Sequence, residues 1–171
     1  MQTVSRLVDD AHFADALAAC CYFVHAYRDG TIALLEARNH KRLLVEVLAL
    51  KCDELQRGDE ATMRGWFEKA LKLAVAEFGT RHRQTARVHQ LYSEALWNRA
   101  IYFQAKDTDE RLEECLRHQE AELRINEALF GATHANTLRS ALRCVLSLRH
   151  LGRKEDADAL EHKYAGCAAF E

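Results

Sequence analysis

The same eight-residue pattern, Phe-Gly-x-x-His-x-x-Thr, occurs twice in this chain. It reads FGTRHRQT at Phe78–Thr85 and FGATHANT at Phe130–Thr137, 52 positions further along. When residues 70–85 are overlaid on 122–137 without a gap, six of the 16 positions are identical. Self-similarity at a fixed offset indicates a repeat architecture, in which each unit is one supersecondary element.

The composition and the apolar periodicity indicate what that element is. The 171 residues include no proline and only seven glycines, too few to turn a domain built from strands. Apolar residues recur with a helical period almost throughout. We therefore expect an all-α chain, with helices at roughly 9–28, 32–56, 60–78, 83–106, 109–130, 136–151 and 153–165.

The octet has two interpretations, as a site used twice or as a joint between helices. Two histidines one repeat apart would lie roughly 10 Å from each other, too far to share one metal ion or one acid–base role. We therefore expect a joint in which phenylalanine closes the end of one helix against the core, glycine stops that helix, and histidine and threonine start the next. The residues in these roles are Phe78, Gly79, His82 and Thr85 in the first copy and Phe130, Gly131, His134 and Thr137 in the second.

A second register supports the same repeat. Met63 and Cys115 each lie 16 positions before an octet glycine, and Ala157 lies five positions after Gly152 as Met63 does after Gly58. We expect these three residues to occupy one kind of position, where two helices cross closely. The expected organisation is a single domain, 1–171, with helix pairs at roughly 31–78, 83–130 and 136–165 and an incomplete unit at 1–30.

These segments resemble the tetratricopeptide repeat of the kinesin light chain type. FEKALKLAVAEFGTRH (Phe67–His82) and EAELRINEALFGATHANT (Glu120–Thr137) are similar to the end of its second helix, and LRHLGRKEDADAL (Leu148–Leu160) to its turn between helices. The resemblance implies a right-handed superhelical array of antiparallel helix pairs, a TPR-like α-solenoid of about three pairs and six or seven helices. It also implies that the first helix of each pair lines a concave groove.

Such a groove is suited to an extended or helical peptide, so the expected function is that of a protein-interaction adaptor or scaffold. In the helix near 136–151, the apolar face is expected to hold Leu138, Ala141, Leu142, Val145, Leu148 and Leu151. The residues then expected to contact a partner are Arg87, Gln90, Glu94, Asn98, Arg139, Arg143 and Ser147. The three arginines favour an acidic partner segment, and a solvated charged face is the plainer alternative.

Other chemistry has little support in the sequence. Glu114, His118 and Glu122 share one helix face at four-residue steps and could bind a metal with further ligands, which leaves a metal-dependent enzyme as a distant alternative. No nucleotide-binding or nucleophile motif is present. The net charge of -2 gives no basic stripe for nucleic acid, so RNA binding is a further distant alternative. We expect no enzyme activity and no cofactor.

The cysteines and the first helix suggest where and how the chain works. The six cysteines lack the spacing of a disulfide framework or a metal site, and no leader or membrane-spanning run is recognised, so a reducing, cytoplasmic location is expected. The expected helix at 9–28 is apolar nearly all round. A second copy or a larger assembly could cover it, and a structural subunit, for instance of a cytoskeletal assembly, is therefore the second functional interpretation.

Overall fold

The computed structural model describes residues 60–102 and 107–165. They form five helices, and no strand occurs among them. The helices are α4 (Glu60–Phe78), α5 (Arg83–Tyr102), α6 (Thr108–Phe130), α7 (Ala135–His150) and α8 (Lys154–Tyr164). The all-α prediction is confirmed for this part of the chain.

The helix bounds agree closely with the periodicity. The expected segment 60–78 is α4 residue for residue, and α6, α7 and α8 begin and end within one residue of expectation. The segment expected at 83–106 is helical to Tyr102, and 103–106 lie outside the described residues. The expected helices at 9–28 and 32–56 also lie outside them, as does the proposed N-terminal unit.

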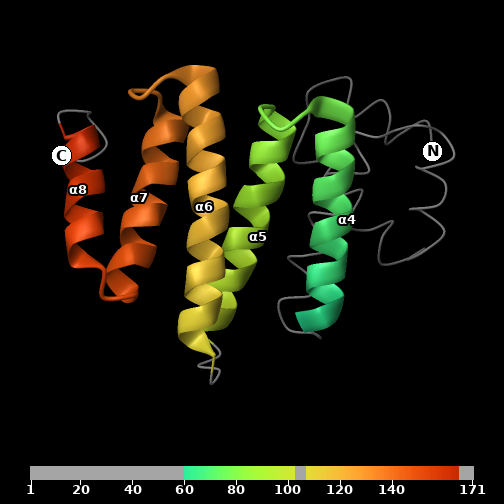
Figure 1. Cartoon of the computed structure of the whole chain (residues 1–171), viewed down its shortest axis with the longest axis horizontal. Coiled ribbons are helices and arrows are strands. Elements are labelled where there is room, and N and C mark those ends of the chain that lie inside the picture. The colour runs from blue at the N-terminus through green and yellow to red at the C-terminus, as the bar shows by residue number, and fades with distance from the viewer. Residues whose placement is uncertain (1–59, 103–106, 166–171) are drawn as a thin grey trace, which may run out of the picture.

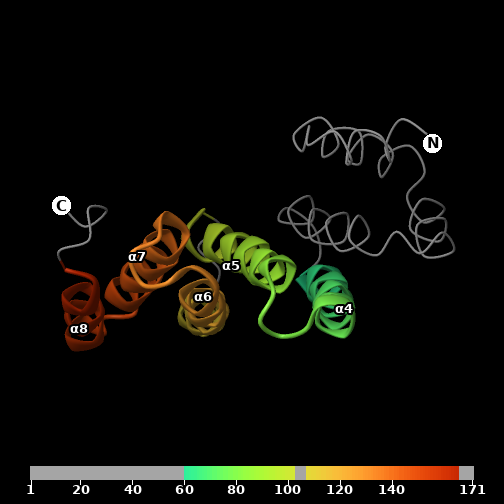
Figure 2. The same cartoon turned by 90° about the horizontal axis from the view of Figure 1, so that it is seen from above.

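Consecutive helices run antiparallel and each packs against the next along the chain (Figure 1). Seen from above, α4, α6 and α8 lie in one row and α5 and α7 in a second row (Figure 2). Both octets lie at the same end of the helices, where α4 turns into α5 and α6 turns into α7 (Figure 1).

The two octets have the same backbone geometry. Gly79 and Gly131 have φ of 84° and 83°, in the left-handed region where glycine is favoured. The amide of each glycine donates to the carbonyl four residues earlier, which closes the last turn of the helix. One position before α7, His134 accepts the amide of Asn136 at Nδ1 (3.1 Å), as an N-cap residue does. His82 accepts the amide of Gln84 in the same way, also at 3.1 Å.

The threonines and phenylalanines complete each joint. Thr85 Oγ1 donates to the Gly79 carbonyl at 2.7 Å, and Thr137 Oγ1 donates to the Gly131 carbonyl at 2.8 Å. Each phenylalanine ring stacks on the histidine of its own octet, with ring centroids 4.9 Å apart in the first copy and 4.6 Å in the second. Every group of the octet is thus used inside its own joint.

One part of the joint prediction is wrong. Phe78 is half-buried and packs against the core, but Phe130 is 37% exposed and does not close the end of α6 against the interior. The ring of Phe130 covers the His134 imidazole instead. A phenylalanine at this position therefore predicts the joint, but it does not predict whether the ring is buried.

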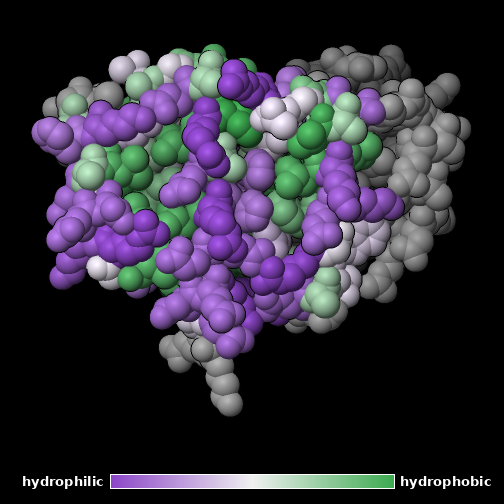
Figure 3. Space-filling view, in the orientation of Figure 1, coloured by the Kyte–Doolittle hydropathy of each residue, from purple (hydrophilic) through white to green (hydrophobic). Residues whose placement is uncertain are grey.

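The core consists of two apolar clusters, one centred on α4 and α5 and one running from α6 to α8. Met63, Cys115 and Ala157, the three residues expected at one kind of position, are all completely buried. Tyr164, near the end of α8, is buried as well. On the face shown in Figure 3, polar side chains follow α6, and apolar surface lies on either side of it.

Candidate partner-binding face

The expected partner-binding residues lie on α5 and α7, which form the second row of helices (Figure 2). No backbone contact joins α5 directly to α7, because α6 packs against both of them. Two side-chain contacts nevertheless bridge these helices. Arg143 pairs with Glu94 at 2.6 Å, and the Trp97 ring meets the His150 ring edge-on at 4.9 Å.

The outward side of α7 is partly apolar. Leu142 and Leu146, one turn apart, are 42% and 43% exposed. This corrects the prediction that Leu142 belongs to the buried face. The exposed Arg139 lies one turn before the leucine pair and Arg149 one turn after it.

The charge of α7 has one sign. Its sixteen residues include three arginines and one histidine and no acidic residue. Arg149 pairs with Glu161 of α8 at 2.8 Å. Arg139 makes no hydrogen bond or ion pair with any described residue. Arg139 is therefore the arginine of α7 whose charge is not compensated by a described carboxylate.

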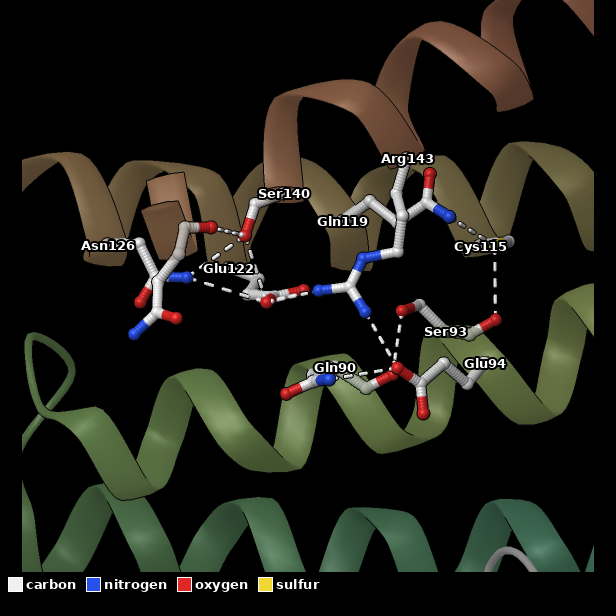
Figure 4. Close-up of polar contacts among 10 residues, drawn as sticks. Gln90, Ser93, Glu94, Cys115, Gln119, Glu122, Asn126, Ser140 and Arg143 are labelled. Atoms are coloured by element: carbon white, nitrogen blue, oxygen red, sulfur yellow. Dashed lines mark hydrogen bonds and ion pairs between the residues drawn. The ribbon is translucent and has the colours of Figure 1, made fainter. Parts of the chain in front are cut away.

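Arg143 is not available to a partner in the way the sequence suggested. Its guanidinium lies between two carboxylates, Glu94 of α5 at 2.6 Å and Glu122 of α6 at 2.5 Å (Figure 4). Gln90 donates to the same Glu94 oxygen at 2.9 Å. Three of the predicted contact residues are thus engaged with one another or with α6.

Glu122 is the buried centre of this arrangement. Its Oε1 accepts hydrogen bonds from Arg143 at 2.5 Å, Ser140 at 2.9 Å and Asn126 at 3.4 Å (Figure 4). Burial raises the pKa of this carboxyl, while Arg143 and Ser140 oppose the shift. Glu122 Oε2 and Arg143 Nε are buried without a hydrogen-bond partner among the described residues, so the network is incompletely satisfied.

Ser147 faces the interior. It is completely buried, and its hydroxyl donates to Gln119 Oε1 at 2.7 Å. Gln119 in turn donates to Cys115 Sγ, whose thiol donates to the Ser93 carbonyl, each at 3.2 Å. The prediction of Ser147 as a groove residue is therefore wrong, because its face of α7 packs against α6.

The remaining predicted residues lie on α5. Arg87 and Asn98 are both half-buried. Arg87 acts on Glu122 through its charge and lowers the pKa of that carboxyl, against the larger effect of burial. Arg139 alone, of the seven predicted residues, is exposed, and the other six are half-buried or buried.

The three side chains considered as metal ligands do not converge. Glu114 pairs with Arg64 at 2.5 Å and accepts from Tyr92 Oη at 2.9 Å. His118 is hydrogen-bonded to His89, and Glu122 to Arg143. Within residues 60–102 and 107–165, no group of three acidic, histidine or cysteine side chains could hold a metal ion.

A second charged region lies where α4 and α6 begin. Glu60 pairs with Arg64 and with Arg111, each at 2.8 Å. Arg64 also forms an ion pair with Glu114. Burial raises the pKa of Glu60, but the two arginines outweigh it and hold that pKa below its usual value. These mutual contacts tie α4 to α6 across α5.

The buried thiols are poor nucleophiles. Burial raises the pKa of Cys115 to about 12, and it raises the pKa of Cys144 as well. Both cysteines are free and buried. A thiol whose pKa is raised in this way holds little thiolate at neutral pH.

Two observations bear on location and assembly. None of the helices in the described part of the chain is long and apolar enough to cross a membrane. The apolar N-terminal helix, on which the expectation of self-association rests, lies outside the described residues.

Comparisons with other proteins give no further assignment. No family model, no curated protein and no solved structure matches this chain.

Proposed function

We propose that this chain is a protein-interaction adaptor built as a right-handed TPR-like superhelix, and that it binds a segment of a partner protein across α5 and α7. The two-row arrangement of antiparallel helices supports this proposal (Figure 2). Stacked helix pairs present the outward faces of one row as a continuous surface, and such surfaces hold extended or helical segments.

The single observation that carries the proposal is the exposed leucine pair of α7. Leu142 and Leu146 lie one turn apart, so they present two apolar side chains on one line of the helix surface. Single exposed leucines are ordinary on a protein surface. A pair on one line, flanked by Arg139 and Arg149, is the arrangement that an amphipathic partner segment would match.

The charge of the same surface determines the chemistry of the partner. Arg143 is neutralised by Glu94 and Glu122, so Arg139 is the arginine with the most to gain from an acidic group. We therefore expect the partner segment to place two apolar residues one turn apart with an acidic residue beside them. Arg143 acts as a positioning residue, because it holds α5, α6 and α7 in register beneath the surface.

No catalytic role is proposed. The histidines of the octets cap helices, the thiols of Cys115 and Cys144 are buried with raised pKa values, and Glu114 and Glu122 are paired with arginines. The free thiols Cys115 and Cys144 are compatible with a reducing, cytoplasmic location, which is part of the proposal.

The proposal can be tested with a matched peptide set. Three fluorescent peptides would carry two leucines four residues apart, with acidic, neutral or basic neighbours. Their binding to the full chain would be measured by fluorescence anisotropy at two salt concentrations. The acidic peptide should bind most tightly, and its affinity should fall as salt is added, because opposite charges on a surface are screened.

The chain offers a close control for the leucines. Leu129, at the end of α6, is 41% exposed and lies off the α5–α7 surface. The pair of substitutions Leu142→Ser and Leu146→Ser should weaken the acidic peptide at least tenfold, while Leu129→Ser should leave it unchanged. Equal binding of the three peptides, or an equal loss from Leu129→Ser, would rule out this surface as the binding site.

A further inference from the structure

A partly buried pair of histidines joins α5 to α6. The Nδ1 atoms of His89 and His118 are 2.9 Å apart, and their rings are 5.2 Å apart between centroids. Phe67 of α4 contacts both imidazoles, with its ring centroid 4.8 Å from that of His118 and 6.3 Å from that of His89. Tyr92 stacks on Phe67 at 3.6 Å and meets His118 edge-on at 4.9 Å.

We infer that this contact between His89 and His118 is an acid-sensitive latch, which releases α4 from α5 and α6 when the two imidazoles take up protons. The inference is independent of the proposed binding function. It concerns the opposite end of the described array from the leucines of α7.

The geometry limits how many protons the pair can hold. In an Nδ1–Nδ1 hydrogen bond one ring must donate and the other must accept, so the two rings cannot both be fully protonated while the contact lasts. Phe67 packs against both rings and covers part of them, so their full exposure to water requires α4 to move away. Among the described helices, the interface of α4 with α5 is also less extensive than that of α5 with α6, so we expect α4 to be the helix that separates.

The charges around the pair oppose protonation further. Arg124 of α6 acts on His89, and Arg117 of α6 and Arg64 of α4 act on His118. The two acidic groups one turn from His118 on α6 are both paired, Glu114 with Arg64 and Tyr92 and Glu122 with Arg143. Burial is the main cause that lowers the pKa of His89 to about 4, and burial and the neighbouring His89 lower that of His118 to about 3.

The sign of the pH effect follows from these directions. With α4 released, both rings face water and take up protons near the ordinary pKa of about 6.5. Between that pH and about 4 the open form binds more protons than the closed form, so acid favours opening. At pH 5 the opening equilibrium should increase roughly 25-fold for one histidine, and up to about 600-fold for both, relative to pH 7.

The test compares the chain with a variant whose pair cannot titrate. Asparagine places an amide group near the position of Nδ1, so His89→Asn with His118→Asn keeps a polar contact without a titratable group. Amide hydrogen exchange in α4 would be measured in both full-length proteins at pH 7.5, 6 and 5. Because the two proteins are compared at equal pH, the intrinsic exchange rates and the protonation of Glu60 and Glu114 cancel.

The latch predicts that α4 amides open more in the unaltered protein than in the variant as the pH falls, while α7 amides do not. The α6–α7 interface serves as an internal reference. Its residue equivalent to His89, 52 positions further along, is Ala141, which has no titratable group. If the double variant is too unstable to compare, the amide exchange of α4 can be compared with that of α7 within the unaltered protein. Imidazole ¹⁵N shifts should also show two neutral rings at pH 6.

Either of two results would overturn the inference. One is a ring of the folded protein that titrates at or above pH 6.5. The other is an amide exchange of α4 in the unaltered protein that equals that of the variant, or changes as that of α7 does, at every pH.

Discussion

The α4–α5 and α6–α7 interfaces share a backbone design but differ in chemistry. Their joints are the two octets, with the same glycine φ, the same histidine cap and the same threonine hydrogen bond. At an offset of 52 positions, however, six apolar residues of the first interface are replaced by polar ones in the second. The replaced pairs are Phe67/Gln119, Ala70/Glu122, Ala74/Asn126, Val88/Ser140, Leu91/Arg143 and Ala95/Ser147.

Every polar member of the second set is bonded to another member of it. Glu122 accepts from Arg143, Ser140 and Asn126, and Ser147 donates to Gln119. The corresponding residues of the first set are buried and apolar. Helices joined in the same way can thus be held together by either kind of interface, provided that the polar one is paired as a set.

The difference has an energetic consequence. A substitution in an apolar interface lowers the stability in proportion to the apolar volume that it removes. Removing one partner of a buried ion pair leaves the other charge buried without compensation. The α6–α7 interface should therefore be sensitive to single changes and tolerant of concerted ones.

The largest effect is expected for Arg143→Leu, which installs the residue that the first interface has at this position. Glu122 would then be buried without its cation, and the free energy of unfolding should fall by about 3–5 kcal/mol in urea titrations. Because burial already raises the pKa of Glu122, the loss should be smaller at pH 5 than at pH 8, where the carboxyl must stay ionised.

The control is the concerted change, Arg143→Leu with Glu122→Ala, which reproduces the Leu91 and Ala70 pair. It should recover most of the lost stability, because both charges leave together. If the single variant lost under about 1 kcal/mol, the ion pair would not be a central contact of the second interface.

A medium effect is expected at the glycines that the two joints share. Gly79→Ala and Gly131→Ala place a side chain at φ near 84° with no steric clash, so each should cost about 1–2 kcal/mol through backbone strain alone. Gly65→Ala is the control, since Gly65 lies inside α4 with open space around it and should gain about 0.5–1 kcal/mol. Thermal unfolding would measure all three. Clearly unequal losses at Gly79 and Gly131 would show that the joints are not equivalent.

The smallest effect is expected at the threonines. Thr85→Val and Thr137→Val keep the buried shape but remove the donor to the glycine carbonyl, which should cost about 1 kcal/mol at each site. Serine at either position retains the hydroxyl but removes the buried methyl group, which should cost a similar amount. Valine variants as stable as the unaltered protein would mean that these hydrogen bonds contribute nothing net.

The joints were predictable because they are local. Glycine at positive φ, a capping histidine two residues before the amide it binds and a threonine in the first turn depend on a few neighbouring residues. The same local chemistry explains why α4 and α7 begin and end where the periodicity expects.

The polar interior was not predictable by the same reasoning, because the helical period assigns the apolar residues of each helix to its buried face and the polar residues to its exposed face. That assignment placed Leu142 inside and Ser147 outside, and the structure has the reverse. One signal was present in the sequence. The 52-residue overlay aligns Arg143 with Leu91 and Glu122 with Ala70, so two opposite charges fall at positions that are apolar in the other copy.

The histidine pair was missed for a different reason. His89 and His118 lie on different helices, and the sequence does not give the rotation of one helix relative to the other. The spacing of residues groups His118 only with Glu114 and Glu122 of its own helix. Contacts across helices depend on packing, which a periodic pattern constrains only to a face.

The most direct test of the account is chemical-shift mapping of the full chain, labelled with ¹⁵N and methyl ¹³C, during titration with the acidic two-leucine peptide. The account predicts saturable shifts at Arg139, Leu142 and Leu146 and at the half-buried α5 residues Arg87 and Asn98, with Leu129 and the termini of α8 unmoved. Shifts centred on Leu129 or on the charged region at Glu60 and Arg111, or no saturable shift at all, would contradict a binding surface formed by α5 and α7.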